Sequence, residues 1–182
     1  MPAGKNAAAA TEVDDRKPTD PVDWASHYWE KRELGDHQEA FLAMSSTMRL
    51  HRILVDSLEK ELKNFGLNLT DYLLLMTLVL SENGTRLLSR LAWNLMVHAT
   101  TITLATDRLE AQGLLRREAH PTDRRATCVT ISDKGMKLAL KATDALKQIE
   151  FGLTGSNPAG QRQLITVLAA MRSAAGDVDR IH

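Results

Sequence analysis

The chain has 182 residues, of which 43% are hydrophobic but only 4% aromatic, and its 23 basic and 23 acidic side chains cancel. This length suits one domain with tails, and the abundance of Leu and Ala favours helices over a β-sandwich or barrel. The single Cys128 excludes an intrachain disulfide framework and a multi-cysteine metal site. No apolar run reaches the roughly 18 residues of a membrane span and no secretory signal is recognisable, so we expect a cytoplasmic protein without a membrane partner.

The two signs of charge are segregated along the chain, although a net charge of zero by itself argues against nucleic-acid binding. Residues 11–39 hold nine acidic and four basic side chains. Residues 86–125 hold seven arginines against four carboxylates, which leaves a local positive excess. A polyanion such as DNA would therefore bind the second segment.

The first residues predict a tail followed by a helix with an aromatic side. Residues 1–20 combine Ala, charged side chains and Pro without an apolar period, which is typical of a flexible tail. A helix is expected to begin at Pro21 and to carry Trp24, Tyr28 and Trp29 on one side. This patch suits either packing or the surface of a ligand or partner.

A long amphipathic helix is predicted from Gly35, because apolar residues recur at helical spacing over roughly 28 residues, where the mean helix has about 11 or 12. One small domain cannot bury such a stripe, so we expect it to pack on a partner helix or a second subunit. A buried helix should follow, with Thr70 as its N-cap and Gly84 as its stop.

Residues 85–113 predict two short helices, the first ending near Leu95 and the second at Gly113, with a tight step at 97–99. Two helices joined in this way form a helix-turn-helix. In the second helix, the spacing places four residues on the core side: Ile102, Ala105, Thr106 and Leu109. The residues expected to face outward are Thr100, Thr103, Leu104 and Asp107.

Residues 114–131 predict a β-hairpin, since apolar residues stand on both sides of the Pro-led turn HPTDRR. Leu114 and Leu115 precede the turn, and the apolar residues after it belong to the second strand. Ser132 is a natural N-cap for the next helix, and a last helix should begin near Pro158.

Taken in order, these elements resemble the winged helix-turn-helix regulators of the MarR family over roughly residues 37 to 175. The resemblance is carried by the segments LTDYLLLMTL, LSRLA, TTITLATDRLEAQGLLRRE, DRRATCVTISDKG and LITVLAAM. The fold class that it implies is mainly α with a small β-hairpin wing, that is, a winged helix-turn-helix domain plus a helical dimerisation region. The expected parts are a tail at 1–20, dimerisation helices at 21–66 and 135–182, and a DNA-binding domain at 67–134.

The resemblance also implies a function. Such proteins are homodimers whose first and last helices interlock, and each subunit places one helix in a major groove and one wing along the adjacent minor groove. Most repress transcription, and many release DNA when a small aromatic or phenolic ligand binds. We therefore predict a dimeric, sequence-specific repressor that binds double-stranded DNA at a pseudo-palindromic operator with half-sites about one helical turn apart.

The wing and the second helix of the helix-turn-helix supply the candidate DNA-binding residues. An arginine at a hairpin tip can reach phosphates or the negative potential of a narrow minor groove. Threonine hydroxyls can contact phosphates or base edges, and a leucine can contact a thymine methyl. The predicted set is Thr100, Thr101, Thr103, Leu104, Arg124, Arg125, Arg86 and Arg90.

Several of these residues also have a simpler interpretation. Thr100 could cap its helix, Arg86 and Arg90 could only solvate the first helix, and the turn could hold weak surface ion pairs. Asp123 is expected to orient the turn through a charge-assisted hydrogen bond. The resemblance implies that Asp107 pairs with a wing arginine. It also implies that a basic residue is frequent where Leu104 stands, so guanine readout from that position is lost here.

Ligand sensing has a weaker basis in the sequence. Cationic and aromatic groups near the junction of the dimer and DNA-binding parts would suit a carboxylate or phenolate, although such residues more often pack or lie on the surface. The residues proposed for this role are Trp29, His37, His51 and Arg52. Leu73 and Leu104 replace the acid and base of the urate-responsive branch of the family. Cys128 stands on a wing strand, unlike the N-terminal cysteine of related peroxide sensors, so a small buried thiol is expected.

A catalytic interpretation finds no support, because the chain lacks a Gly-rich phosphate loop, a His next to its Cys and metal-ligand spacing such as HExxH. We expect a protein without enzymatic activity, cofactor or metal. Two other classes stay open. The first is a winged-helix protein-interaction module with weak DNA binding, which the neutral charge favours, and the second is a ligand-binding dimer that has lost its DNA function.

Overall fold

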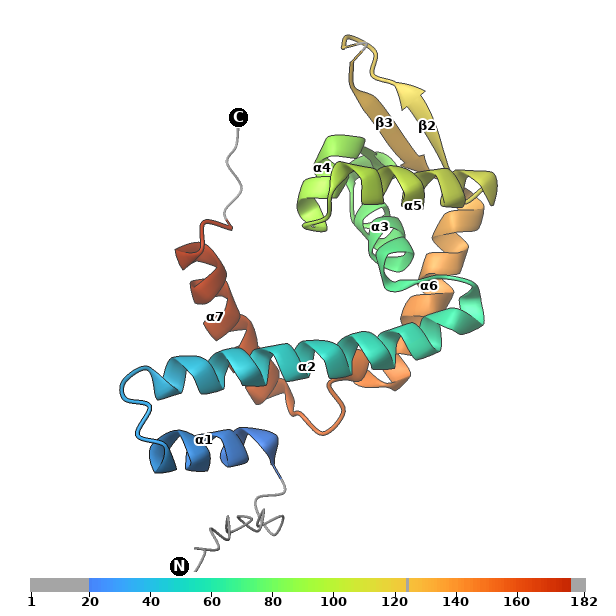
Figure 1. The fold of residues 1–182 in the computed structure, drawn as a ribbon. Coiled ribbons are helices and arrows are strands. Elements are labelled where there is room, and N and C mark those ends of the chain that lie inside the picture. The colour runs from blue at the N-terminus through green and yellow to red at the C-terminus, as the bar shows by residue number, and fades with distance from the viewer. Residues whose placement is uncertain (1–19, 124, 178–182) are drawn as a thin grey trace, which may run out of the picture. The chain divides into compact units, whose positions relative to one another are not determined.

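The computed structural model of the chain describes residues 20–123 and 125–177 (Figure 1). The predicted N-terminal tail lies outside this range apart from Asp20. The chain divides into two units between Arg52 and Ile53, inside its longest helix. Within the described ranges, no helix is both long enough and apolar enough to cross a membrane.

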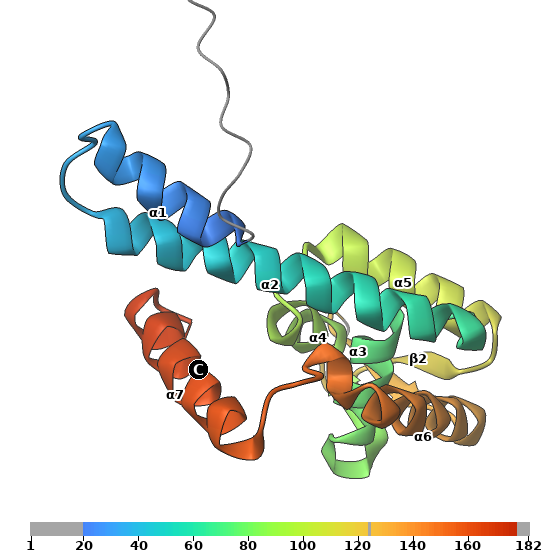
Figure 2. The same cartoon turned by 90° about the horizontal axis from the view of Figure 1, so that it is seen from below.

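The first unit contains helix α1 (Pro21–Lys31) and the beginning of helix α2 (Gln38–Leu62), which lie side by side (Figure 2). α1 begins at Pro21 as predicted, because the Asp20 carboxylate accepts hydrogen bonds from the first free backbone N–H groups. The Trp29 indole donates to the carbonyl of Gly35 at 2.9 Å, and its ring centroid lies 5.0 Å from that of Phe41. This contact closes the turn between the two helices.

The second unit holds the remaining elements in the predicted order. They are α3 (Leu69–Val79), β1 (Thr85–Leu87), α4 (Leu88–Asn94), α5 (Ala99–Ala111), β2 (Leu115–Ala119), β3 (Thr127–Ile131), α6 (Asp133–Gln148) and α7 (Pro158–Ala174), with single 3-10 turns at Lys63–Phe65, Glu82–Gly84 and Glu150–Gly152. The mainly helical fold with a small wing is thus confirmed. So are the starts of the last two helices, since Ser132 and Asn157 cap them.

Helix α3 is the centre of the core, and it packs against α5 and α6. Leu74, Leu75 and Leu78 of α3 are fully buried, as the apolar run predicts. The Tyr72 hydroxyl lies 3.0 Å from the Thr143 hydroxyl of α6, which satisfies two polar groups at this contact.

Both predicted ends of α3 are wrong. Its N-cap is Asn68 rather than Thr70, because the Asn68 side chain accepts from the Asp71 N–H while Asp71 accepts from the Asn68 N–H. Its last residue is Val79 rather than a position next to Gly84, because the chain enters a 3-10 turn in which Asn83 is left-handed (φ 56°).

The wing belongs to a three-stranded antiparallel sheet with strand order β1-β3-β2, whereas the sequence predicts two strands. Thr85 of β1 stands opposite Thr130 of β3, and their hydroxyls lie 2.9 Å apart. The third strand was missed because it has only three residues, which run directly into α4. Its partner follows about 40 residues later, so no local pattern marks it.

A close approach of two backbones explains the glycine in the first turn of α6, which follows the hairpin. A Cβ atom at Gly135 would lie 2.0 Å from the carbonyl oxygen of Leu114. Only glycine allows α6 to begin this close to the start of β2. The segment 132–135 (SDKG) therefore holds the start of α6 against the base of the wing.

Candidate nucleic-acid interface

Helices α4 and α5 form the predicted helix-turn-helix. Between them the backbone of Met96 is left-handed (φ 51°), and the Val97 N–H donates to the carbonyl of Ala92 at 3.1 Å. The predicted core side of α5 is confirmed, since all four of its residues are buried: Ile102, Ala105, Thr106 and Leu109. The opposite side of α5 is consequently available for a partner.

The outward side of α5 carries hydroxyl and apolar groups. Thr100, Thr101 and Leu104 are exposed, and Leu104 retains 58% of its surface. Thr103 is half-buried, and its hydroxyl donates to the Ala99 carbonyl at 2.8 Å. A hydroxyl engaged in this way can still accept a hydrogen bond from another group.

The wing turn is shaped by Asp123 and His120. The Asp123 carboxylate accepts from the Arg125 backbone N–H at 2.9 Å, and its carbonyl accepts from Ala126 at 3.0 Å. The ring Nδ1 of His120 accepts from the backbone N–H of Thr122 and of Asp123. These bonds hold the turn backbone so that the Arg125 side chain is exposed at its tip. Arg124 lies outside the described residues.

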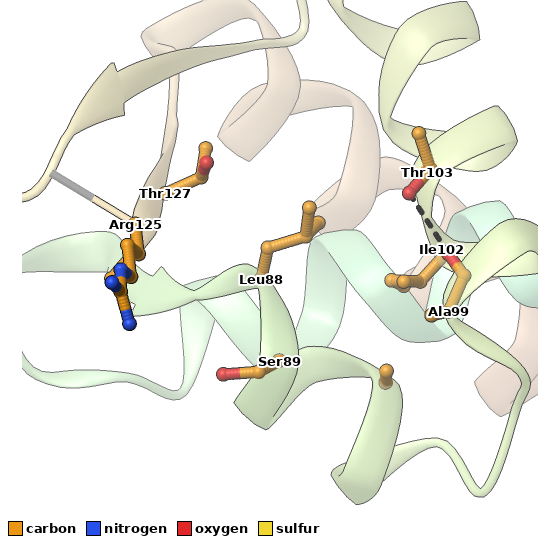
Figure 3. Close-up of a pocket in the computed structure, with 9 residues that line it drawn as sticks. Leu88, Ser89, Ala99, Ile102, Thr103, Arg125 and Thr127 are labelled. Carbon is orange, nitrogen blue, oxygen red and sulfur yellow. Dashed lines mark hydrogen bonds between the residues drawn. The ribbon is translucent and has the colours of Figure 1, made fainter.

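A shallow pocket of about 220 Å³ connects the wing with the helix-turn-helix (Figure 3). Arg125 and Thr127 line it from the wing, while Ala99, Ile102 and Thr103 line it from α5. Ser89 and its neighbours at the start of α4 complete the lining. Arg125 supplies a guanidinium to this lining and Ser89, Thr103 and Thr127 supply hydroxyl groups, all of which can contact an anion such as a phosphate.

An ion-pair clamp ties α5 to the wing, and we name it the Arg117 clamp after its central residue on β2. The Arg117 backbone N–H and Nε each donate to the Glu110 carboxylate at 2.8 Å. Its Nη1 lies 2.5 Å from Oδ1 of Asp107. The hydrogen bonds lower the pKa of Glu110 and raise that of Arg117, so both groups are charged over the whole physiological pH range.

A second ion pair anchors α5 to the core. Nη2 and Nε of Arg108 donate to the two carboxylate oxygens of Asp71 at 2.5 and 3.2 Å. The Asp71 side chain is only 3% exposed and also belongs to the N-cap of α3. Because this carboxylate is buried and paired, it holds Arg108 away from the phosphates that the local positive excess would suggest.

Other arginines of the segment have local partners. Nε of Arg86 donates to the Ser81 hydroxyl at 2.8 Å, and Arg116 pairs with Glu118 on the same strand. Arg90 is half-buried on α4. Asp107 was expected to face a wing arginine, and Arg117 is the arginine that it contacts. Glu110 was not among the predicted site residues, although its position three residues after Asp107 places both carboxylates on one side of α5.

The residues proposed for ligand sensing do not gather at one place within the first unit. Trp29 closes the α1–α2 turn, His37 is an exposed left-handed residue before α2, and His51 is exposed on α2. Arg52 borders a groove of about 360 Å³ between α1 and α2, together with Arg49. The apolar lining of this groove includes Trp24, Phe41, Met44 and Met48.

Among the described residues, no three His, Cys, Asp or Glu side chains are grouped so that they could hold a metal ion. Cys128 is half-buried on β3 rather than fully buried.

Comparison with known proteins relates the chain to one family. The sequence model of the MarR family matches residues 67–127, which include α3, α4, α5 and the wing turn. The HTH-type transcriptional regulator MhqR of Bacillus subtilis is 34% identical over 90 residues. That match spans 50% of this chain and 61% of the length of MhqR.

Solved structures extend the similarity to most of the chain. Sco5413, a MarR family transcriptional regulator from Streptomyces coelicolor, is 32% identical with a TM-score of 0.72, and the match covers 79% of this chain and 100% of Sco5413. Sco3205, a second such regulator from Streptomyces coelicolor, was solved in complex with DNA. It is 25% identical with a TM-score of 0.66, over 80% of this chain and 91% of Sco3205.

The Arg117 clamp predicts a specific dependence of stability on pH. Glu110→Gln should lower the free energy of unfolding by about 1 kcal/mol near neutral pH, because a neutral amide forms weaker bonds to Arg117. The folded-state pKa of Glu110 lies below its ordinary value of 4.5, so the difference is complete above that pH and is lost as pH falls through the lowered pKa. Urea unfolding of both proteins between neutral and acidic pH measures the difference.

Glu118→Gln is the matched control, since Glu118 pairs with Arg116 on the surface and more than half of its side chain is exposed. Its substitution should change stability by only a few tenths of a kcal/mol. A difference between wild type and Glu110→Gln that stays constant into acid would contradict the role assigned to the Glu110 carboxylate.

Proposed function

This chain is a DNA-binding transcriptional regulator of the MarR family, and we propose that it is a dimeric repressor that reads a pseudo-palindromic operator through α5 and the wing. The observation that carries the proposal is the joint surface of α5, α4 and Arg125 around the shallow pocket. A helix-turn-helix and a basic wing at one surface can contact adjacent grooves of a duplex. We assign the protein no enzymatic activity and no cofactor.

Within this proposal, each part of the surface has its own role. Thr100, Thr101, Thr103 and Leu104 would enter the major groove, because they start the outward side of α5. Arg125 would reach the minor groove, as would Arg124, which the structure does not describe. Arg86 and Arg90 would contact the phosphate backbone. Asp107 and Asp123 would orient the wing, which the bonds to Arg117 and to the turn backbone support.

Dimerisation is proposed for residues 21–66 and 135–182, with 67–134 as the DNA-binding domain. Every residue of α7 is exposed or half-buried, although its sequence is rich in apolar residues. Val167 and Met171, which lie one turn apart on one side of α7, each keep more than half of their surface exposed. Ile165 is also exposed but lies on another side of the helix. Exposed apolar side chains on one side of a helix are typical of a subunit interface. A second copy of the chain is the occupant that two operator half-sites require.

Release of DNA by a small aromatic or phenolic ligand is part of the proposal. The groove between α1 and α2 combines aromatic and methionine side chains with Arg49 and Arg52. Its volume of about 360 Å³ falls at the lower end of the range for small-molecule sites. An aromatic carboxylate or phenolate could stack in it and pair with a guanidinium.

Sequence-specific binding is the first test. By fluorescence anisotropy, the dimer should prefer the duplex upstream of its own gene to a scrambled duplex by about 10³-fold or more at physiological salt. Arg125→Ala should weaken binding and lower the slope of log affinity against log salt by about 1 per subunit, because one phosphate contact is lost.

Lys141→Ala removes an equal charge from the exposed side of α6 and should leave the salt slope unchanged. An unaltered slope for Arg125→Ala would refute the wing assignment. Equal weak binding to both duplexes, and to other candidate operators, would favour the protein-interaction module.

Dimerisation through α7 is tested by Val167→Asp, which places a charge on the exposed apolar side of that helix. The variant should sediment as a monomer at micromolar concentration and lose at least about 100-fold in operator affinity, because two half-sites are no longer bound together. Ser173→Asp, which places the same charge on an exposed position of another side of α7, should remain dimeric. A dimer that survives Val167→Asp would exclude this side of α7 from the interface.

Ligand release is tested with benzoate as the probe. Benzoate should displace the operator in a dose-dependent manner, and Arg52→Gln should raise its half-maximal concentration by about tenfold or more, because a charge-assisted bond is lost. Lys60→Gln, on an exposed position of the same helix, should respond as the wild type does. Equal half-maximal concentrations for Arg52→Gln and wild type would remove the groove from the proposal.

A further inference from the structure

The outward side of α5 lacks the side chains that read purine edges. Arg or Lys reads guanine and Asn or Gln reads adenine by paired hydrogen bonds in the major groove. None of these four residue types stands between Ala99 and Asp107 in the sequence. These first turns are the part of a recognition helix that contacts bases. The residues of these turns therefore cannot read purines by paired hydrogen bonds.

The next charged residues of α5 are occupied by the fold. Arg108 follows directly, but Asp71 holds its guanidinium by two hydrogen bonds. Asp107 could in principle accept from cytosine, yet its carboxylate is paired with Arg117. Neither residue can leave its partner without breaking the contacts that position α5. What remains for the bases is the group of threonines and Leu104.

Leu104 is the large apolar side chain of this surface. It is 58% exposed, whereas the neighbouring Ile102 on the core side is 1% exposed. Thr103 turns its hydroxyl to the Ala99 carbonyl (Figure 3), which occupies the only hydrogen that it could donate to a base. An apolar side chain in a major groove has one specific partner among the base edges, and that partner is the C5-methyl group of thymine.

The wing favours the same base pairs for an independent reason. Arg125 is exposed at the tip of a turn whose backbone is fixed by Asp123. An arginine in a minor groove is attracted most strongly where the groove is narrow, and A-tracts have the narrowest grooves. Both elements of the surface thus select A·T pairs, one by methyl contact and the other by groove shape.

We propose that α5 reads thymine methyl groups and that Leu104 is the residue that determines this specificity. The inference rests on the proposed function, since it concerns the operator that the regulator recognises. It identifies the preferred ligand as a duplex with thymine at the α5 contact positions of each half-site, beside A·T-rich minor-groove segments. Guanine at those positions would find neither the Arg nor the Lys that reads it by paired hydrogen bonds.

Replacement of thymine by uracil tests this proposal, because uracil differs from thymine only by the missing methyl group. A site is first selected from random duplexes with the full-length protein, and each thymine is then replaced singly. At one or two positions per half-site the affinity should fall about 4-fold, which corresponds to one lost methyl contact of about 0.8 kcal/mol. Thymines outside the half-sites provide the internal control.

The variant Leu104→Ala should bind the thymine and uracil duplexes equally at those positions. Leu104→Met keeps an apolar side chain of similar size and should retain the preference for thymine. Because Leu104 is exposed, both variants should unfold at the same urea concentration as the wild type. The preference is read as a ratio of two affinities of one protein, so a general loss of affinity does not alter it.

The outcomes separate the inference from the function. Failure to select any preferred duplex would contradict the proposed function itself. A specific duplex that tolerates uracil at every position would overturn methyl readout and leave the regulator intact. Unchanged discrimination by Leu104→Ala would show that another residue reads the methyl group, which would also overturn the assignment.

Discussion

The guanidinium of Arg117 pairs with two carboxylates of α5, and the relative position of α5 and the wing depends on that clamp. Arg117 lies on β2, only six residues after the end of α5. Both the backbone N–H and the side chain of Arg117 donate to the Glu110 carboxylate, so β2 is bonded to α5 through its main chain as well as through a side chain. A protein that contacts two adjacent DNA grooves must hold its helix and its wing at a fixed distance, since each element alone binds DNA weakly.

The same clamp reduces the negative charge that α5 carries beside a polyanion. Asp107 and Glu110 would repel phosphates if they were free, and Arg117, which pairs with both, offsets one of their two negative charges. Conversely, the buried Asp71 carboxylate pairs with Arg108, whose side chain is 43% exposed. The arginines of residues 86–125 that the structure describes therefore divide into structural and exposed ones, and the local excess read from the sequence overstates the charge offered to DNA. Arg125 at the wing tip belongs to the exposed ones.

Much of the fold could be predicted because its signals are local. Helix starts at Pro21, Ser132 and Pro158 follow from residue chemistry at single positions, and the core side of α5 follows from helical spacing. The errors arise where the deciding contact is distant or competitive. Thr70 is a good capping residue, yet Asn68 is the N-cap of α3 because its side chain and that of Asp71 each accept a hydrogen bond from the other residue's backbone N–H.

The candidate site was predictable in outline but not in its connections. Exposure of Thr100, Leu104 and Arg125 follows from periodicity and turn chemistry. The pairing of Asp71 with Arg108 joins residues 37 positions apart, and no spacing rule indicates it. The number of arginines can be taken from the sequence, but which of them form ion pairs or hydrogen bonds depends on the fold.

The central claim is that α5 and the wing act as one rigid reader, and hydroxyl-radical cleavage of the selected operator tests it directly. The account predicts protected minor-groove segments flanking two major-groove half-sites about one helical turn apart. It also predicts that Arg125→Ala loses only the flanking protection. A footprint without flanking segments, or one that Arg125→Ala leaves unchanged, would contradict a DNA-contacting wing held by the Arg117 clamp.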